Sequence, residues 1–421
     1  MVKKILIALI CFMAYGANAQ NGTISPYSFF GIGDLRAAGT IENQMMGGLS
    51  MYTDSIHLNL RNPAAYGKLR LTTYSAALSH REIRLESFTE EQGTSVTNLE
   101  YLAIGFPLSP RFAAGFGLKP YSSVGYNLVA ESINANQATV TNQYTGDGGL
   151  NRAYLSLGYQ LADNLHLGAT ASFNFGRLNN RRVQSVENVQ FGTVDRRTSR
   201  VNGYDFNYGL TYTPTFKDKY TLFTSVTVNT QANLVSENSQ TIGSFSLTTG
   251  EDIEVVDVNL DATGLRNTEL KIPTTTTFGL GFGEDKKWFL GGEYSFQGLS
   301  SFTNAFIDVE NVAYQDASSI AFGGFFIPDY TSFQSYFKRI TYRAGLRMDK
   351  SGLVVNNKEI NNFGITFGLG LPLGSSFSNV NVGFELGRRG TTTADLIQEN
   401  YLKVNIGLSL NDKWFRKRQI D

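Results

Sequence analysis

Catalytic and metal-binding chemistry would have to come from few residues in this chain. His57, His80 and His166 are its only histidines, and no two of them have the spacing of metal ligands. No Gly-x-Ser-x-Gly nucleophile motif occurs, and the one cysteine, Cys11, falls in an N-terminal apolar run. Because no recognisable site geometry is present, the sequence predicts a protein that is not an enzyme and binds no metal and no cofactor.

Charged side chains form a second group with chemical potential. Arg339, Arg343 and Arg347 recur at every fourth position of one predicted strand, so they point to the same side of it. Glu293 and Glu385 take the same inward facing on two other predicted strands. Charges inside a barrel need partners or water. Two interpretations stay open: a structural ion-pair network, or an arginine ladder that holds the anionic head group of a ligand.

These charges lie on predicted strands in which apolar residues alternate with polar or small ones. In the last of them, 400–411, every second residue is apolar (Leu402, Val404, Ile406, Leu408 and Leu410) and the residues between are polar or small. Such alternation is typical of a strand with one face in lipid and the other in a polar lumen, although a soluble two-sheet protein would alternate too. The 43 Gly, 21 Tyr and 30 Phe against 9 Pro and 2 Trp fit an exported membrane barrel.

The N-terminus favours the membrane interpretation. Lys3 and Lys4 precede an apolar run over 5–13 and the sequence Ala17-Asn18-Ala19, which together predict a signal peptide over 1–19. The run is too short for a transmembrane helix, which needs roughly 20 residues. The whole chain has 36 basic and 36 acidic residues, and without these two lysines 34 basic residues remain against 36 acidic ones. This balance indicates no nucleic-acid partner. We expect export to the outer membrane of a Gram-negative bacterium.

Loop lengths give the number of strands. Thirteen alternating segments are evident between 69 and 411, but an odd number is unusual for a bacterial single-chain barrel. Short turns and long loops alternate correctly only if a further strand covers 318–327. We therefore predict an all-β fold, a transmembrane β-barrel of fourteen antiparallel strands over 69–415, with a short periplasmic tail at 416–421.

The segment before the first strand, 20–68, has no sustained period and predicts a hatch that plugs the lumen. Its apolar residues Phe29, Phe30, Met45 and Met46 are candidates to line a ligand path, and Asn62, Pro63 and Ala64 stand just before the first strand. Inward-facing glycines cluster in the C-terminal half: Gly279, Gly281, Gly364, Gly368, Gly370, Gly383, Gly387 and Gly407. They leave room for a plug or a ligand tunnel, or only accommodate strand twist.

On this Asn-Pro-Ala motif after a strand-free segment, the chain resembles the FadL family of outer-membrane transporters for long-chain fatty acids and other hydrophobic compounds. The resemblance implies a fourteen-stranded barrel closed by an N-terminal hatch. It also implies sideways release of the ligand through a kinked strand. Gly117, Pro120 and Gly125 on the third predicted strand suit such a kink, since proline removes a ladder donor. A bulge without any transport function is the alternative.

Two functions follow as expectations. The first is diffusion-type uptake of long-chain fatty acids or other hydrophobic compounds, gated by the hatch and the kinked strand, with membrane lipid and a hydrophobic ligand as partners. The alternative is an accessory or carrier barrel of an outer-membrane secretion or biogenesis complex, whose partners are other subunits. An apolar path beside the hatch would favour the first, and a packed lumen the second.

Overall fold

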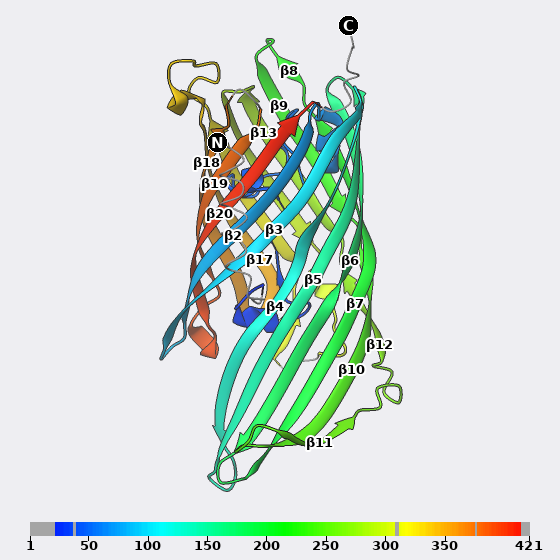
Figure 1. Ribbon diagram of the computed structural model, residues 1–421, viewed down its shortest axis with the longest axis vertical. Coiled ribbons are helices and arrows are strands. Elements are labelled where there is room, and N and C mark those ends of the chain that lie inside the picture. The colour runs from blue at the N-terminus through cyan, green and yellow to red at the C-terminus, as the bar shows by residue number, and fades with distance from the viewer. Residues whose placement is uncertain (1–21, 37–38, 308–310, 375–376, 414–421) are drawn as a thin grey trace.

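The computed structural model describes residues 22–36, 39–307, 311–374 and 377–413, and the predicted signal peptide and tail lie outside them. One antiparallel sheet closes into a barrel because the last strand, β20 (Gln398–Asp412), pairs with the first long strand, β2 (Thr72–Glu86), from Thr72↔Asp412 to Glu86↔Gln398 (Figure 1). Within the described residues, no helix is both long and apolar enough to span a bilayer.

The wall has fourteen strands, as predicted. Twelve are single elements: β2, β3 (Glu91–Ser109), β4 (Phe112–Ile133), β5 (Thr139–Ala162), β6 (Leu165–Val186), β7 (Phe191–Tyr212), β14 (Trp288–Gln297), β16 (Ala317–Phe326), β17 (Thr341–Val355), β18 (Lys358–Pro372), β19 (Asn379–Arg389) and β20. Two more are each built from consecutive elements, β9 (Tyr220–Asn229) with β10 (Ala232–Ser246), and β12 (Asn267–Ile272) with β13 (Thr275–Glu284), which gives 12 + 2 = 14. The strand expected over 318–327 is β16.

Short elements complete the chain. The additional strands are β1 (Asp34–Leu35), β8 (Thr215–Phe216), β11 (Asp252–Asp257) and β15 (Val312–Tyr314). The helical turns are η1 (Pro26–Phe29), α2 (Ile41–Gln44), η2 (Pro63–Lys68), η3 (Leu299–Ser301), η4 (Tyr336–Arg339) and η5 (Thr393–Asp395). Since η4 ends before β17 begins, Arg339 does not belong to the strand of Arg343 and Arg347. That part of the predicted arginine ladder is wrong.

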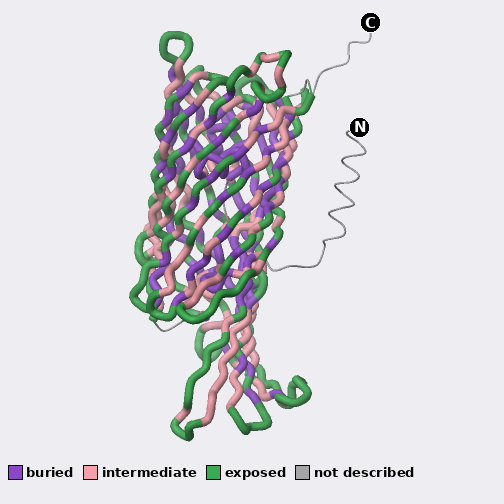
Figure 2. Tube along the Cα trace, turned by 90° about the vertical axis from the view of Figure 1, so that its left-hand side faces the viewer, coloured by how far each residue is buried: buried purple, intermediate pink, exposed green. Residues whose placement is uncertain are grey.

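Alternation along the strands separates two faces, visible as alternating colours in Figure 2. On β20, Leu402, Ile406 and Leu410 are exposed, whereas Lys403 and Asn405 are each 2% exposed and point inward. The same alternation is present on β5, β7 and β18, where apolar residues such as Leu155, Tyr204 and Phe367 are exposed. A closed barrel with an apolar exterior satisfies its backbone hydrogen bonds between strands, as a membrane requires.

The two ends of the barrel differ. Short turns join strands at one end, and at the other β4 to β7, β10 and β11 project well beyond the barrel (Figures 1 and 2). Strand β10 continues to Ser246 and pairs there with β7 and β11. The sequence does not display this extension as an alternating segment, because a strand in water on both faces loses the apolar alternation of a lipid-facing one. Outer-membrane barrels carry their short turns on the periplasmic side.

Residues 22–36 and 39–68, named the hatch segment here, pack inside the barrel, and the inward glycines make room for it. A Cβ atom at Gly383 would lie 2.6 Å from Cε of Met45, and one at Gly279 would lie 2.7 Å from Cβ of Met51. Others of the predicted set accommodate wall side chains, as Gly370 does for Arg343. The room left by these glycines is therefore filled by protein.

Candidate functional site

The barrel wall is interrupted between β3 and β4. These strands pair only from Leu102↔Leu118 to Ser109↔Phe112. Beyond Leu118, β4 continues along β5 as far as Ile133, and β3 runs along β2 back to Glu91. Among the described residues, 119–133 of β4 and 91–101 of β3 thus have no ladder between them. We call this the wall gap.

The predicted kink residues stand at this gap. Pro120 follows the last paired residues of β4, and the β4–β5 register shifts between Pro120 and Ser122, which leaves a bulge at Tyr121. A proline has no N–H to offer a neighbouring strand, and a bulge bends the strand that carries it. Gly117 lies in the paired part, opposite Ala103, and the Gly125 N–H donates to Oγ of Ser28 in the hatch segment at 3.1 Å.

The hatch segment occupies the wall gap. Strand β1 pairs with β4 through Asp34↔Ser123 and Leu35↔Ser122, and the Arg36 N–H donates to the Tyr121 carbonyl at 3.0 Å. On the β3 side, the Arg36 guanidinium lies 3.0 Å from Glu100. Residues 22–36, which we call the stopper segment, therefore close the wall without a covalent link to either flank.

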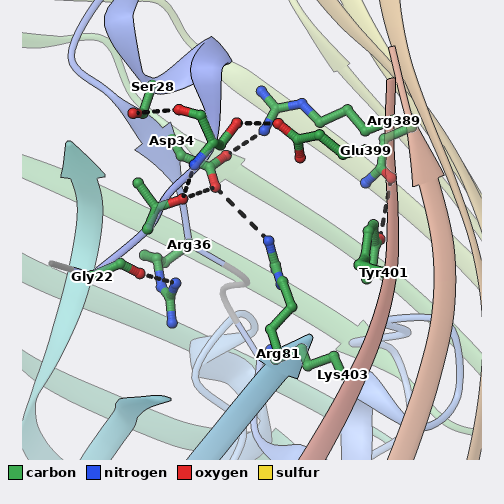
Figure 3. A network of polar contacts seen from close by, with 12 residues as sticks. Gly22, Ser28, Asp34, Arg36, Arg81, Arg389, Glu399, Tyr401 and Lys403 are labelled. Carbon is green, nitrogen blue, oxygen red and sulfur yellow. Dashed lines mark hydrogen bonds and ion pairs between the residues drawn. The ribbon is translucent and has the colours of Figure 1, made fainter. Parts of the chain in front are cut away.

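Buried charges hold the stopper segment (Figure 3). Asp34 is 2.7 Å from Arg389 of β19 and 4.0 Å from Arg81 of β2. Burial alone would raise the pKa of the Asp34 carboxyl, but the nearby guanidinium groups lower it below its ordinary value. A buried carboxylate with charged partners is costly to leave alone, so the contact fixes the position of the segment.

The network extends to β3 and β20. Lys403 lies 3.1 Å from Glu100, which also receives Arg36, and the Ser25 hydroxyl donates to Glu399. Sequence reasoning did not single out Asp34, Arg36, Glu100 or Glu399. Inward parity on the strands was the available signal, but it does not say which hatch residue each charge meets.

An apolar groove lies beside the gap. Its volume is about 560 Å³ and its walls come from β2, β3, β4 and β20, with lipid-facing residues such as Leu102, Phe116 and Leu118. Gly117 lines it too, and a Cβ there would lie 2.8 Å from the Tyr154 hydroxyl. A small apolar molecule that leaves the gap would therefore meet an apolar surface.

The Asn-Pro-Ala motif anchors the far end of the hatch segment. The Asn62 side chain accepts from the Ala64 N–H at 3.1 Å, which caps η2, and donates to Thr211 of β7 at 3.0 Å. A Cβ at Gly209 would lie 2.6 Å from Oδ1 of Asn62. The motif therefore docks on β6 and β7, while Tyr66 at the end of the same turn packs against Gly115 in the paired part of β4.

The four apolar hatch residues do not form one path. Phe29 stacks edge-on against Tyr126 at 5.1 Å in a cluster near the projecting strands. Met45 and Met46 are 1% and 2% exposed and belong to two separate clusters. Phe30 packs against a fourth cluster. Because the hatch segment is compact and irregular, neighbouring residues point to different walls, and these side chains pack the lumen.

The lumen charges are mostly paired. Arg347 is 2.8 Å from Glu385 and 2.5 Å from Asp349. Glu293 is 3.0 Å from Arg61 and accepts from the Ser50 N–H at 2.6 Å. For these residues the ion-pair network is the better description. Arg343 donates a hydrogen bond to Asn381 at 3.0 Å and has no ion pair with any of the described residues.

The histidines lie apart. Nδ1 of His57 is 2.6 Å from Asp54, and burial, which would raise the pKa of Asp54, is outweighed by His57, which lowers it to about 2. His80 contacts Thr97 on the exposed face, and His166 is buried on β6. Over the described ranges, no group of three or more His, Cys, Asp or Glu side chains could hold a metal ion.

These features define a class: a fourteen-stranded barrel of the outer-membrane type, with a plugged lumen and a wall interrupted beside the plug. Its fold is FadL-like. The toluene transporter TbuX of Ralstonia pickettii has a TM-score of 0.60 at 13% identity over 89% of this chain and 99% of its own. The toluene transporter TodX of Pseudomonas putida has a TM-score of 0.58 at 15% identity, over 91% of this chain and 100% of its own. A Pseudomonas aeruginosa FadL homologue has a TM-score of 0.57 at 12% identity, over 91% of this chain and 100% of its own.

A family model described as BamG matches residues 1–421, and the chain belongs to the BamG family. No curated protein sequence matches it. The predicted resemblance to FadL transporters is confirmed for the fold, while the family that the sequence matches carries a different name.

Proposed function

We propose that the protein lets small hydrophobic molecules, long-chain fatty acids or other apolar compounds, cross the outer membrane. They leave the lumen sideways through the wall gap when the stopper segment moves. The observation that carries this proposal is the missing β3–β4 ladder, closed only by residues 22–36. The similar solved structures are described as toluene transporters and a monoaromatic hydrocarbon channel, which supports a hydrophobic cargo.

A sideways exit suits an apolar cargo energetically. Keeping apolar surface out of water is worth roughly 25 cal/mol per Å², so a molecule gains by passing from the gap into lipid and not into the periplasm. The apolar groove lined by Leu102, Phe116 and Leu118 is the surface it would meet first.

Opening the gap is a modest backbone rearrangement. Strand β1 has only two residues in register with β4, so few ladder hydrogen bonds must break. The larger cost is the separation of Asp34 and Arg36 from their partners on β2, β3 and β19. Those charges can be hydrated once the segment has moved, because water then reaches the lumen.

A disulfide lock tests the proposal. Leu35 and Ser122 are directly opposed across β1 and β4, at a separation that suits a disulfide. In cells that lack their own uptake channel, the oxidised Leu35→Cys/Ser122→Cys variant should take up labelled oleate or toluene at least 10-fold more slowly than the reduced form. The matched control is Ser156→Cys/Thr170→Cys, a directly opposed pair within the continuous wall, which should leave uptake unchanged. Equal uptake by the oxidised and reduced lock refutes sideways passage.

A second candidate function is that of an accessory or carrier barrel in an outer-membrane secretion or biogenesis complex. The full-length match to a family named BamG favours it, and so does the close packing of Met45 and Met46 in the lumen. Purification in mild detergent separates the two. A subunit that co-purifies at a fixed stoichiometry, together with no uptake above that of empty cells, supports the accessory function.

A further inference from the structure

A second cavity lies inside the barrel at its short-turn end, away from the wall gap. Its volume is about 770 Å³, and the hatch segment contributes Asp54 and His57 to its lining. The turns after β5 and β13 contribute Asp163 and Asp285, so the cavity faces the periplasm in the orientation of outer-membrane barrels. This volume is within the range of small-molecule sites, roughly 300–1,000 Å³.

Two arginines in its lining lack charged partners. Arg343 is 8% exposed, and its Nε atom has no hydrogen-bond partner. Nε of Arg339, on η4, is also buried and without a partner. Among the described residues, neither guanidinium has a carboxylate within ion-pair distance, whereas Arg347, the next inward arginine of β17, has two. A buried guanidinium without an acid is costly unless a ligand or water satisfies it.

Among the described residues, no carboxylate that lines the cavity lies within ion-pair distance of the two arginines. Asp54 is paired with His57 at 2.6 Å. Glu42 accepts from Asn381 at 2.8 Å through Oε1, and its Oε2 has no partner. Over the whole lining, seven basic side chains (Lys68, Arg70, Lys219, Lys286, Arg339, Arg343 and Lys413) stand against five carboxylates (Glu42, Asp54, Asp163, Asp218 and Asp285), even with His57 neutral. This excess of positive charge favours an anion.

One wall of the same cavity is aromatic. Tyr52 packs with its ring centroid 5.2 Å from that of Phe223 and 4.9 Å from that of Phe325, and all three line the cavity. Ile327 and Phe377 add apolar surface. A ligand that suits both parts has an anionic head and an apolar body.

We propose that this cavity binds a small amphiphile with an oxyanion head, a carboxylate or a phosphate, from the periplasmic side. The head lies against Arg339 and Arg343, whose planar donors match an oxyanion. The apolar body lies against Tyr52 and Phe325. The site is separate from the wall gap and does not depend on passage through it.

Equilibrium binding to the purified full-length protein in non-ionic detergent tests this. Octanoate and octyl phosphate carry both the anionic head and the apolar tail. Inorganic phosphate carries the head alone, and octan-1-ol carries the tail without an anionic head. Octanoate or octyl phosphate should bind saturably at one site, at least 10-fold more tightly than phosphate or octanol. If inorganic phosphate binds as tightly as octyl phosphate, the site takes a free anion and the amphiphile is refuted.

Variants locate the binding. Arg343→Met and Arg339→Gln should each weaken octanoate binding by about 10-fold or more, while Arg388→Gln on the exposed face of β19 should not. Arg339 is on a half-exposed turn, so its variant keeps the test valid if Arg343→Met fails to fold. The oxidised Leu35→Cys/Ser122→Cys lock should bind octanoate normally, which separates this site from the proposed exit. Unchanged affinity in Arg339→Gln, or loss of binding in the lock, overturns the proposal.

Discussion

Removal of the Asp34 charge should release the stopper segment from the wall gap. Asp34→Asn keeps the shape of the side chain but leaves Arg389, 2.7 Å away, without its carboxylate. Removing one partner of a buried pair typically costs 3–5 kcal/mol. The two side chains are 10% and 16% exposed, so water screens them little, and we take the lower end, about 3 kcal/mol.

That cost falls on the position of residues 22–36, because Arg389 and Arg81 belong to the wall. At about 1.4 kcal/mol per tenfold change, the displaced population should rise by roughly 100-fold. Hydrogen exchange detected by mass spectrometry measures it through the Arg36 N–H, which is bonded to the Tyr121 carbonyl at 3.0 Å. Exchange over 22–36 should become roughly 100-fold faster, and that over 41–66 should not change.

The matched control is Glu293→Gln, which breaks another hatch-to-wall contact, at Arg61 and Ser50. It should speed exchange near Ser50 and leave 22–36 unchanged. If Asp34→Asn exchanges like the wild type over 22–36, or if the control variant releases the same residues, the charges at Asp34 do not hold the segment.

Three further predictions concern the hatch segment. Gly345→Ala would place a Cβ against the Gly47 backbone and should lower the free energy of unfolding by about 1–3 kcal/mol; Gly93→Ala, with open space, should not, as thermal melting can show. Asn62→Ala loses the η2 cap and should cost about 1 kcal/mol in the same assay. His57→Gln should destabilise the protein most between about pH 4 and 6.5. The pKa of Asp54 is lowered to about 2, so its contribution to the free energy of unfolding is present above pH 3.8 and is lost as the pH falls. The pKa of His57 is raised, so its contribution is full below pH 6.5 and is lost as the pH rises. A wild-type minus variant difference that does not depend on pH would contradict this pairing.

Much of the barrel could be predicted because lipid imposes a strict pattern. The strand predicted over 400–411 is β20, Gln398–Asp412, and the missing strand over 318–327 followed from loop parity alone. The projecting ends of β7 and β10 do not stand out in the sequence, since both of their faces meet water and polar residues fill both parities. The sequence predicts a strand where the short helix η4 lies, because arginines at every fourth position fall on one side of a strand and on one side of a helix alike.

The candidate site was predicted only in part. Pro120 could be predicted to disturb its strand from the sequence alone, because every proline lacks the backbone N–H that a neighbouring strand needs, and Pro120 stands at the wall gap. The charges that close the gap, such as Asp34 with Arg389, join residues 355 positions apart, and no local pattern says which inward charge meets which hatch residue. The positions of Met45 and Met46 in separate clusters likewise depend on the path of an irregular segment.

One density map tests the central claim most directly. The Asp34→Asn protein would be purified in mild detergent, reconstituted in a lipid nanodisc with a long apolar compound, and imaged. We predict that residues 22–36 leave the space between Glu100 and Ser122, and that elongated apolar density extends from the lumen through this space to the groove at Phe116. A stopper segment still in place, with no ligand density in the wall gap, would contradict sideways passage.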